Sequence, residues 1–134
     1  MKFFQIHDIV TDQISKSYDL VLSRHTIQHL KNMDVRDILQ NFVSSGSKYV
    51  LATNHPYLEV YLFSNYKIIN FLLLQENMEL DETTKIRMRG VNLFLKPYQL
   101  PLPICQHWDA FYPDVIMLWD LRTLAGCQSQ LGCF

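Results

Sequence analysis

The sequence predicts an α/β fold, and three observations carry that prediction. Residues 18–22 form a compact apolar run of the kind found in buried strands. Residues 34–45 repeat apolar side chains at helical spacing, and residues 47–54 have the character of a second strand. A strand, a helix and a strand in this order predict a crossover unit whose two strands are parallel in one sheet.

Length and composition fit one globular domain. The chain has 134 residues, of which 49% are hydrophobic and 19% charged, so it can bury a core. The net charge is -1, from 12 basic and 13 acidic residues, which argues against a nucleic-acid-binding surface. The apolar stretch 60–74 is broken by polar residues and falls short of a bilayer span. We therefore predict a cytoplasmic protein with no membrane partner.

The first predicted strand belongs to the stretch 18-YDLVLSRHTIQHL-30. Its apolar run lacks alternation, so we expect both of its faces to be buried, as in a parallel sheet. Three polar residues, Ser23, Arg24 and His25, follow the run directly. Residues 26–30 then read as a helical turn.

The predicted helix 34–45 has recognisable ends. Asp34 stands where an N-cap residue belongs, and Gly46 stands where a C-terminal glycine belongs. The side chains at the spacing of one helical face are Val35, Ile38, Leu39, Phe42 and Val43.

The other segments give weaker signals. Residues 3–6 form a short β-type run, and residues 114–121 read as a further buried strand. The three prolines within 91–103 favour an extended segment at a sheet edge. Residues 57–75 fit either a strand or a helix. Residues 76–87 are charged and polar, as in a solvated loop.

The three cysteines, Cys105, Cys127 and Cys133, match no zinc-binding spacing. We expect free thiols in a reducing compartment. The alternative is a disulfide between Cys127 and Cys133.

The pieces 6-IHDI-9, 19-DLVLSRHTIQHL-30 and 47-SKYVLATN-54 resemble the C-terminal part of the class I S-adenosylmethionine-dependent methyltransferases. The resemblance covers roughly residues 3–56 and 90–120 of the chain. It implies a partial Rossmann-like sheet, with strands 3 to 7 of the family order 3-2-1-4-5-7-6, and flanking helices. The whole chain, 1–134, would then be a single truncated methyltransferase-like domain.

The same resemblance implies S-adenosylmethionine as cofactor. Asp8 would hold the adenine amino group, with Ile9 beside the ring. Ser23, Arg24 and His25 would line the cofactor at the exit of the next strand, since ligands of open parallel sheets bind beyond the carboxyl ends of the strands. His29 is the candidate for proton handling near a substrate.

Each of these residues has an alternative role. Asp8 is also typical of a turn or helix cap, and Arg24 has Asp34 and Asp37 as alternative partners to a cofactor carboxylate. His25 and His29 have the spacing of one helix face. However, Thr26 stands where a zinc protease needs glutamate, so we predict no metal site.

The sequence departs from the family in two ways. The glycine-rich loop after the first strand is absent, because the 4 glycines form no GxG motif. Residues 59–75 also look like an insertion. We therefore expect a methyltransferase-like protein with little or no catalysis as given, and with an unknown methyl acceptor. The alternative is a non-catalytic remnant or interaction module that pairs through exposed strand edges with a partner or a second copy.

Overall fold

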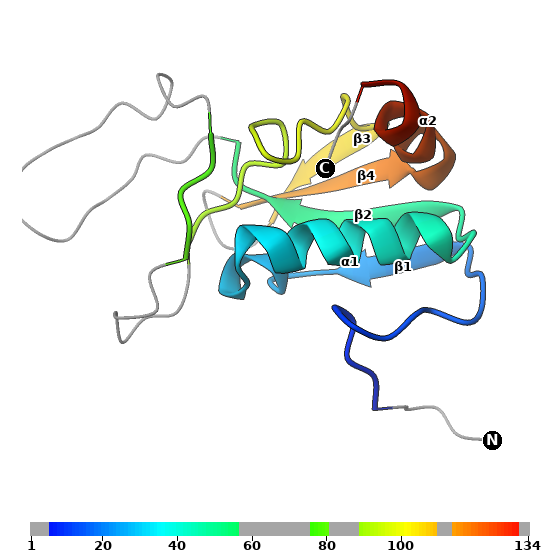
Figure 1. Cartoon of the computed structure of the whole chain (residues 1–134). Coiled ribbons are helices and arrows are strands. Elements are labelled where there is room, and N and C mark those ends of the chain that lie inside the picture. Colours follow the sequence, from blue (N-terminus) through cyan, green and yellow to red (C-terminus); the bar gives the residue numbers. More distant parts are fainter. Residues whose placement is uncertain (1–5, 57–75, 81–88, 110–113, 132–134) are drawn as a thin grey trace, which may run out of the picture.

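The computed structural model describes residues 6–56, 76–80, 89–109 and 114–131. Within them, 4 strands form one mixed sheet in the order β1-β2-β4-β3 (Figure 1). β1 and β2 are parallel, whereas β4 is antiparallel to both of its neighbours, β2 and β3. The predicted α/β class is therefore confirmed. The strand bounds are β1 Leu20–Ser23, β2 Tyr49–Asn54, β3 Cys105–Trp108 and β4 Val115–Asp120.

The predicted strand–helix–strand unit is present as β1, α1 (Asn32–Ser44) and β2, with a short 3-10 turn, η1 (Ile27–His29), before the helix. Gly46 follows α1 with φ of 70°, the left-handed conformation expected of a C-terminal glycine. The predicted N-cap at Asp34 is wrong, because α1 begins two residues earlier and Asp34 lies in its first turn. The reason is tertiary: the amide of Asn32 donates to the carboxylate of Glu79, which satisfies the helix start from outside.

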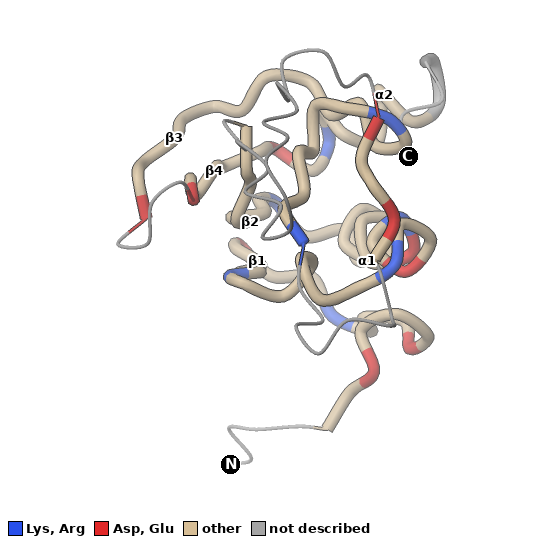
Figure 2. Tube along the Cα trace, turned by 90° about the vertical axis from the view of Figure 1, so that its left-hand side faces the viewer, with Lys and Arg blue, Asp and Glu red and all other residues tan. Residues whose placement is uncertain are grey.

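The core lies on one face of the sheet. Both α1 and α2 (Leu121–Leu131) lie to the same side of the strands (Figure 2), and the two helices contact each other. In β2 and β4, residues alternate between this face and the other, so that Val50 pairs with Trp119 and Ala52 with Met117 in the buried layer. Trp119 also packs edge-on against Phe94 at a ring distance of 6.4 Å.

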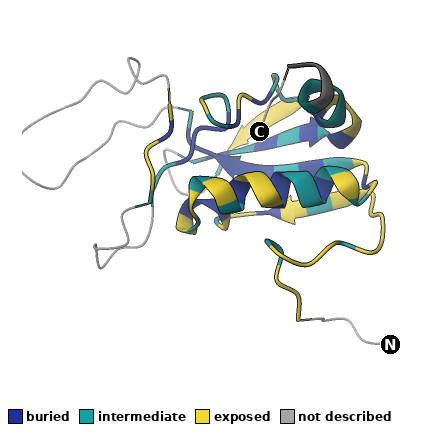
Figure 3. Ribbon diagram, in the orientation of Figure 1, coloured by how far each residue is buried: buried dark blue, intermediate teal, exposed yellow. Residues whose placement is uncertain are grey.

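The opposite face of the sheet is more open, and most residues of the two outer strands β1 and β3 are exposed or only partly buried (Figure 3). Leu20 and Leu22 of β1 are 48% and 62% exposed. The expectation that β1 is buried on both faces is therefore wrong. Among the described residues β1 is an edge strand, paired only with β2, and no described helix covers its outer face.

Residues 91–103 do not form the predicted extended sheet edge; the strand at the edge next to β4 is β3, which follows them. Backbone amides of this segment instead donate hydrogen bonds to side chains from elsewhere in the chain. The amide of Asn92 donates to Asn77 Oδ1 at 2.7 Å, and that of Leu93 donates to Asn54 Oδ1 at 2.7 Å. Consecutive amides held by separate side chains are not available to a strand ladder.

Helix α2 was not predicted, and it contains a cysteine whose state differs from the prediction. Cys105 is a free, exposed thiol, as expected. Cys127 takes part in a disulfide, so the expected free thiol at that position is wrong. The alternative pairing named above involves Cys133, which lies outside the described residues.

Several predictions fall outside the described part of the chain. They are the strand-or-helix segment 57–75 with its suspected insertion at 59–75, and most of the run 3–6. Of that run only Ile6 is described, and it is fully exposed and belongs to no strand. No helix within the described ranges is long and apolar enough to cross a membrane.

Candidate functional site

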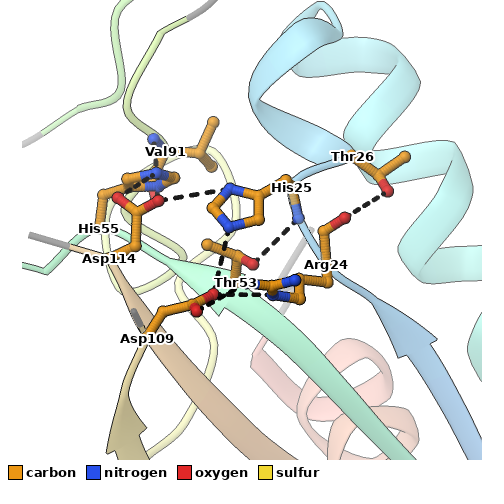
Figure 4. Close-up of polar contacts among 8 residues, drawn as sticks. All are labelled: Arg24, His25, Thr26, Thr53, His55, Val91, Asp109 and Asp114. Carbon is orange, nitrogen blue, oxygen red and sulfur yellow. Dashed lines mark hydrogen bonds and ion pairs between the residues drawn. The ribbon is translucent and has the colours of Figure 1, made fainter. Parts of the chain in front are cut away.

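Polar side chains at or next to the ends of all four strands meet at one end of the sheet (Figure 4). The carboxyl ends of β1 and β2 lie at the same edge because these strands are parallel. β4 runs the other way, so it begins at this edge, and β3 ends there. We call this set the strand-end cluster; its members are Arg24, His25, Thr53, His55, Asp109 and Asp114.

Asp109 anchors the cluster although its side chain is only 4% exposed. Its two oxygens accept from Arg24, from Nη2 at 2.8 Å and from Nε at 3.0 Å. This two-pronged geometry is the strongest form of an arginine–carboxylate pair. The hydrogen bonds that Arg24 donates to Asp109 raise the pKa of Arg24, so the guanidinium stays charged.

His25 lies between two carboxylates. Its Nε2 is 3.1 Å from Asp109 Oδ2, and its Nδ1 is 3.3 Å from Asp114 Oδ2. Both ring nitrogens therefore lie within hydrogen-bonding distance of a carboxylate, and these two contacts fix the position of the ring.

His55 completes the chain of contacts at the end of β2. Its Nε2 is 3.2 Å from Asp114 Oδ1. Its Nδ1 lies 3.1 Å from both the amide nitrogen and the carbonyl oxygen of Val91, so Val91 offers a partner to either protonation state. Burial lowers the pKa of His55, with an opposing contribution from Asp114. In the neutral ring that burial favours, Nδ1 accepts from the Val91 amide and Nε2–H donates to Asp114.

The backbone of His25 is held in an unusual conformation. Its φ of 53° is left-handed, which disfavours residues with a Cβ by about 1 kcal/mol. Its amide donates to Oγ1 of the fully buried Thr53 at 3.0 Å. This hydrogen bond fixes the turn that brings the ring between the two carboxylates. Strained backbone of this kind is concentrated at functional sites.

Ion pairs and hydrogen bonds join the members of the cluster to one another. Arg24 and His25 both contact Asp109, and His25 also contacts Asp114. These contacts hold the exit of β1 against the residue that follows β3 and the residue that precedes β4. Arg24 and His25 keep side-chain exposures of 44% and 25%, which leaves them as the members that a ligand reaches.

The structure brings part of the predicted cofactor site together. Arg24 and His25 lie in the strand-end cluster, and Ser23 is buried beside them as the last residue of β1. Asp8 and Ile9 lie elsewhere. They belong to a turn whose carbonyls, Ile9 among them, accept from Asn41 in the C-terminal half of α1.

Asp8 has the local contacts of a turn residue. Its carboxylate accepts from the amide of Val10 at 3.0 Å, which lowers its pKa, and its amide donates to Asp12 at 2.9 Å. His29, the predicted proton-handling residue, ends η1 and is exposed. It lies on a separate element from His25, which precedes η1.

The sequence reasoning missed His55, Asp109 and Asp114. A signal existed for His55, because it directly follows the predicted strand 47–54, just as the polar residues 23–25 follow the predicted strand 18–22. Asp114 likewise begins the predicted stretch 114–121. Asp109 carried no signal, because β3 was not predicted. Within the described ranges, no group of three or more histidine, cysteine, aspartate or glutamate side chains is arranged to hold a metal ion.

No protein-family model, no curated protein and no solved structure matches the chain.

Proposed function

We propose that the chain is the C-terminal part of a methyltransferase-like protein, related to enzymes that transfer a methyl group from S-adenosylmethionine to an acceptor. One observation carries the proposal. The strand order β1-β2-β4-β3 corresponds to 4-5-7-6, the last part of the sheet order of the class I family that the sequence resembles. The strand-end cluster then lies at the carboxyl edge, where ligands of open α/β sheets bind.

Under this proposal, the same order leads us to expect weak or missing activity. In the family order, strand 1 lies next to strand 4 and leads into the glycine-rich loop. β1 stands at the position of strand 4, and nothing in the described part of the chain pairs with its outer edge. The cofactor would therefore meet only one wall of its crevice, made by Arg24 and His25.

Isothermal titration calorimetry with S-adenosylmethionine and S-adenosylhomocysteine tests the proposal. We expect weak saturable binding, on the order of millimolar, which corresponds to about -4 kcal/mol. Arg24→Gln should weaken it. The matched control is Arg122→Gln, because Arg122 makes a similar two-pronged pair with Asp120 at the opposite end of β4. Absence of saturable binding, or equal effects of the two variants, would contradict the proposal.

The predicted adenine contact requires its own comparison. Asp8→Ala should weaken binding if Asp8 contacts the cofactor. Asp12→Ala is the control, because Asp12 is an exposed aspartate in the same turn. Equal binding by the two variants would assign Asp8 to the turn alone.

A second candidate function is a non-catalytic module that pairs through the edge of β1. It is favoured by the two exposed leucines of that strand, Leu20 and Leu22, because natural edge strands are usually guarded by charge, proline or a covering element. Sedimentation at increasing concentration tests it. A monomer throughout, together with saturable cofactor binding, would reject the module in favour of the enzyme-like reading.

A further inference from the structure

Two adjoining cavities lie along the exposed side of α1, and they share no residue with the strand-end cluster. The larger holds about 510 Å³ between the first turns of α1 and the segment around residues 96–99. The smaller holds about 280 Å³ and continues toward Gln128 of α2. Met33 and Arg36 line both cavities, so they stand at the junction.

Hydrogen bonds fix the walls of the larger cavity. The hydroxyl of Tyr98 donates to Asn32 Oδ1 at 2.6 Å, which ties the 96–99 segment to the start of α1. The side-chain amide of Asn77 donates to the carbonyl of Lys96 at 2.9 Å and to that of Asn92 at 2.8 Å. The cavity is therefore preformed, as small-molecule sites usually are.

One of the charged residues that line the larger cavity, Arg36, is available to bind a ligand. The side chain of Arg36 is exposed and makes no hydrogen bond or ion pair with any described residue. Lys96 lies 3.8 Å from Glu76, but these side chains are 56% and 69% exposed, so the pair is weak. Arg36, Lys96 and Glu76 sum to +1 in the larger cavity.

The cavity also has apolar and neutral polar lining. Met33 is 72% exposed, and its flexible thioether suits an apolar ligand body of varied shape. Pro97 adds a second apolar surface. Gln99 lines the cavity from a left-handed backbone with φ of 50°, which is unusual for a residue with a side chain.

We propose that this cavity binds a small organic carboxylate with an apolar body. The planar guanidinium of Arg36 matches a carboxylate through two parallel hydrogen bonds. Lys96 supplies a second positive charge, and Met33 and Pro97 contact the apolar part of the ligand. The net charge of +1 suits a monoanion better than a phosphate dianion. The site is independent of the proposed cofactor site and does not rest on the methyltransferase reading.

Amide-detected NMR titration of the full chain tests the inference with three probes. Benzoate has both a carboxylate and an apolar ring. Benzyl alcohol has the apolar ring without the negative charge, and inorganic phosphate has negative charge without an apolar part. We expect benzoate to bind saturably, with shifts at the start of α1 and around residues 96–99, and to bind at least about tenfold more tightly than the other two.

Two variants decide the role of the arginine. Arg36→Gln should weaken benzoate binding at least about tenfold, since the fork of donors is lost. Lys48→Gln is the control, because Lys48 is an exposed cation that lies over Tyr49, outside both cavities. Both positions are exposed, so both variants should keep the native spectrum. Equal binding by Arg36→Gln and the wild type, or equal binding of benzoate and either other probe, would overturn the proposal.

Discussion

His25 Nε2 lies 3.1 Å from Asp109 Oδ2, although 84 residues separate the two in sequence. Through this contact the exit of β1, at one edge of the sheet, meets the end of β3, at the other edge. Arg24 reinforces it by donating to the same carboxylate. The two edge strands are thus joined across β2 and β4, which makes Asp109 the side chain on which the geometry of the strand-end cluster depends.

Asp109→Asn should therefore destabilise the fold clearly. The amide keeps the shape of the side chain but loses the charge, and it leaves Arg24 and His25 facing a neutral group. Asp109 is buried, but Arg24 is 44% exposed and solvent weakens the pair, so we expect a loss of roughly 1–3 kcal/mol of unfolding free energy. Urea denaturation followed by circular dichroism measures it. Asp120→Asn is the control, because its partner Arg122 is 75% exposed. Equal losses in the two variants would contradict this role of Asp109.

His55 should make stability depend on pH. Burial lowers its pKa below the ordinary value of 6.5, and its neighbours His25 and Arg89 act in the same direction, while Asp114 and the Val91 carbonyl oppose them. The unfolded chain then binds a proton at His55 while the native chain does not. Stability should therefore fall as the pH drops below about 6.5, by at most about 1.4 kcal/mol per pH unit, until the native ring is protonated.

Urea unfolding of the wild type and of His55→Asn at about pH 7.5 and about pH 5.5 isolates this contribution. The variant should show the smaller loss of stability between the two conditions. NMR titration of the His55 ring in the folded wild type provides a second measurement that does not depend on the variant. An apparent pKa above 6.5, or equal pH dependence in the two proteins, would reject the account.

Local patterns in the sequence predicted the unit β1, α1 and β2 because strand and helix periodicities and a helix-ending glycine act over short distances. They also placed Arg24 and His25 at a strand exit. They did not predict that β4 pairs between β2 and β3, and it is this pairing that brings Asp109 and Asp114 to the histidines. β3 was missed since its CQHW sequence has no apolar pattern and all of it is exposed.

Two glycines should respond to alanine in opposite directions. At Gly46 and at Gly126 an added Cβ has open space beyond its chain neighbours and its own helix backbone, so a clash is expected at neither position. Gly46 has φ of 70°, which alanine adopts at a cost of about 1 kcal/mol. Gly126 lies inside α2, where alanine is favoured over glycine by roughly 0.5–1 kcal/mol. Thermal unfolding should show a lower midpoint for Gly46→Ala and a higher one for Gly126→Ala. Shifts of the same sign would contradict the two backbone conformations.

The backbone geometry of the β1 edge predicts the register in which two copies of the chain would pair through this strand. The carbonyl of Asp19 accepts a hydrogen bond from the amide of Tyr49 in β2. Backbone groups along a strand point alternately to its two sides, so the N–H and C=O groups of Leu20 and Leu22 point away from β2, toward the free edge. Two copies that pair antiparallel can then form hydrogen-bonded pairs between Leu20 and Leu22 in both directions. Val21 lies between these pairs and would face Val21 of the second copy across a two-fold axis.

A cysteine at that position reports this register directly. In a Cys105→Ser background, which removes the exposed native thiol, Val21→Cys should form a disulfide-linked dimer under mild oxidation, because directly opposed side chains in a non-hydrogen-bonded pair are about 4.5–5.5 Å apart at Cβ. Met33→Cys in the same background controls for random collision, because Met33 is 72% exposed on α1, away from the sheet edge. Non-reducing electrophoresis compares the two. If Met33→Cys dimerises as readily as Val21→Cys, or if neither does, β1 does not pair with itself.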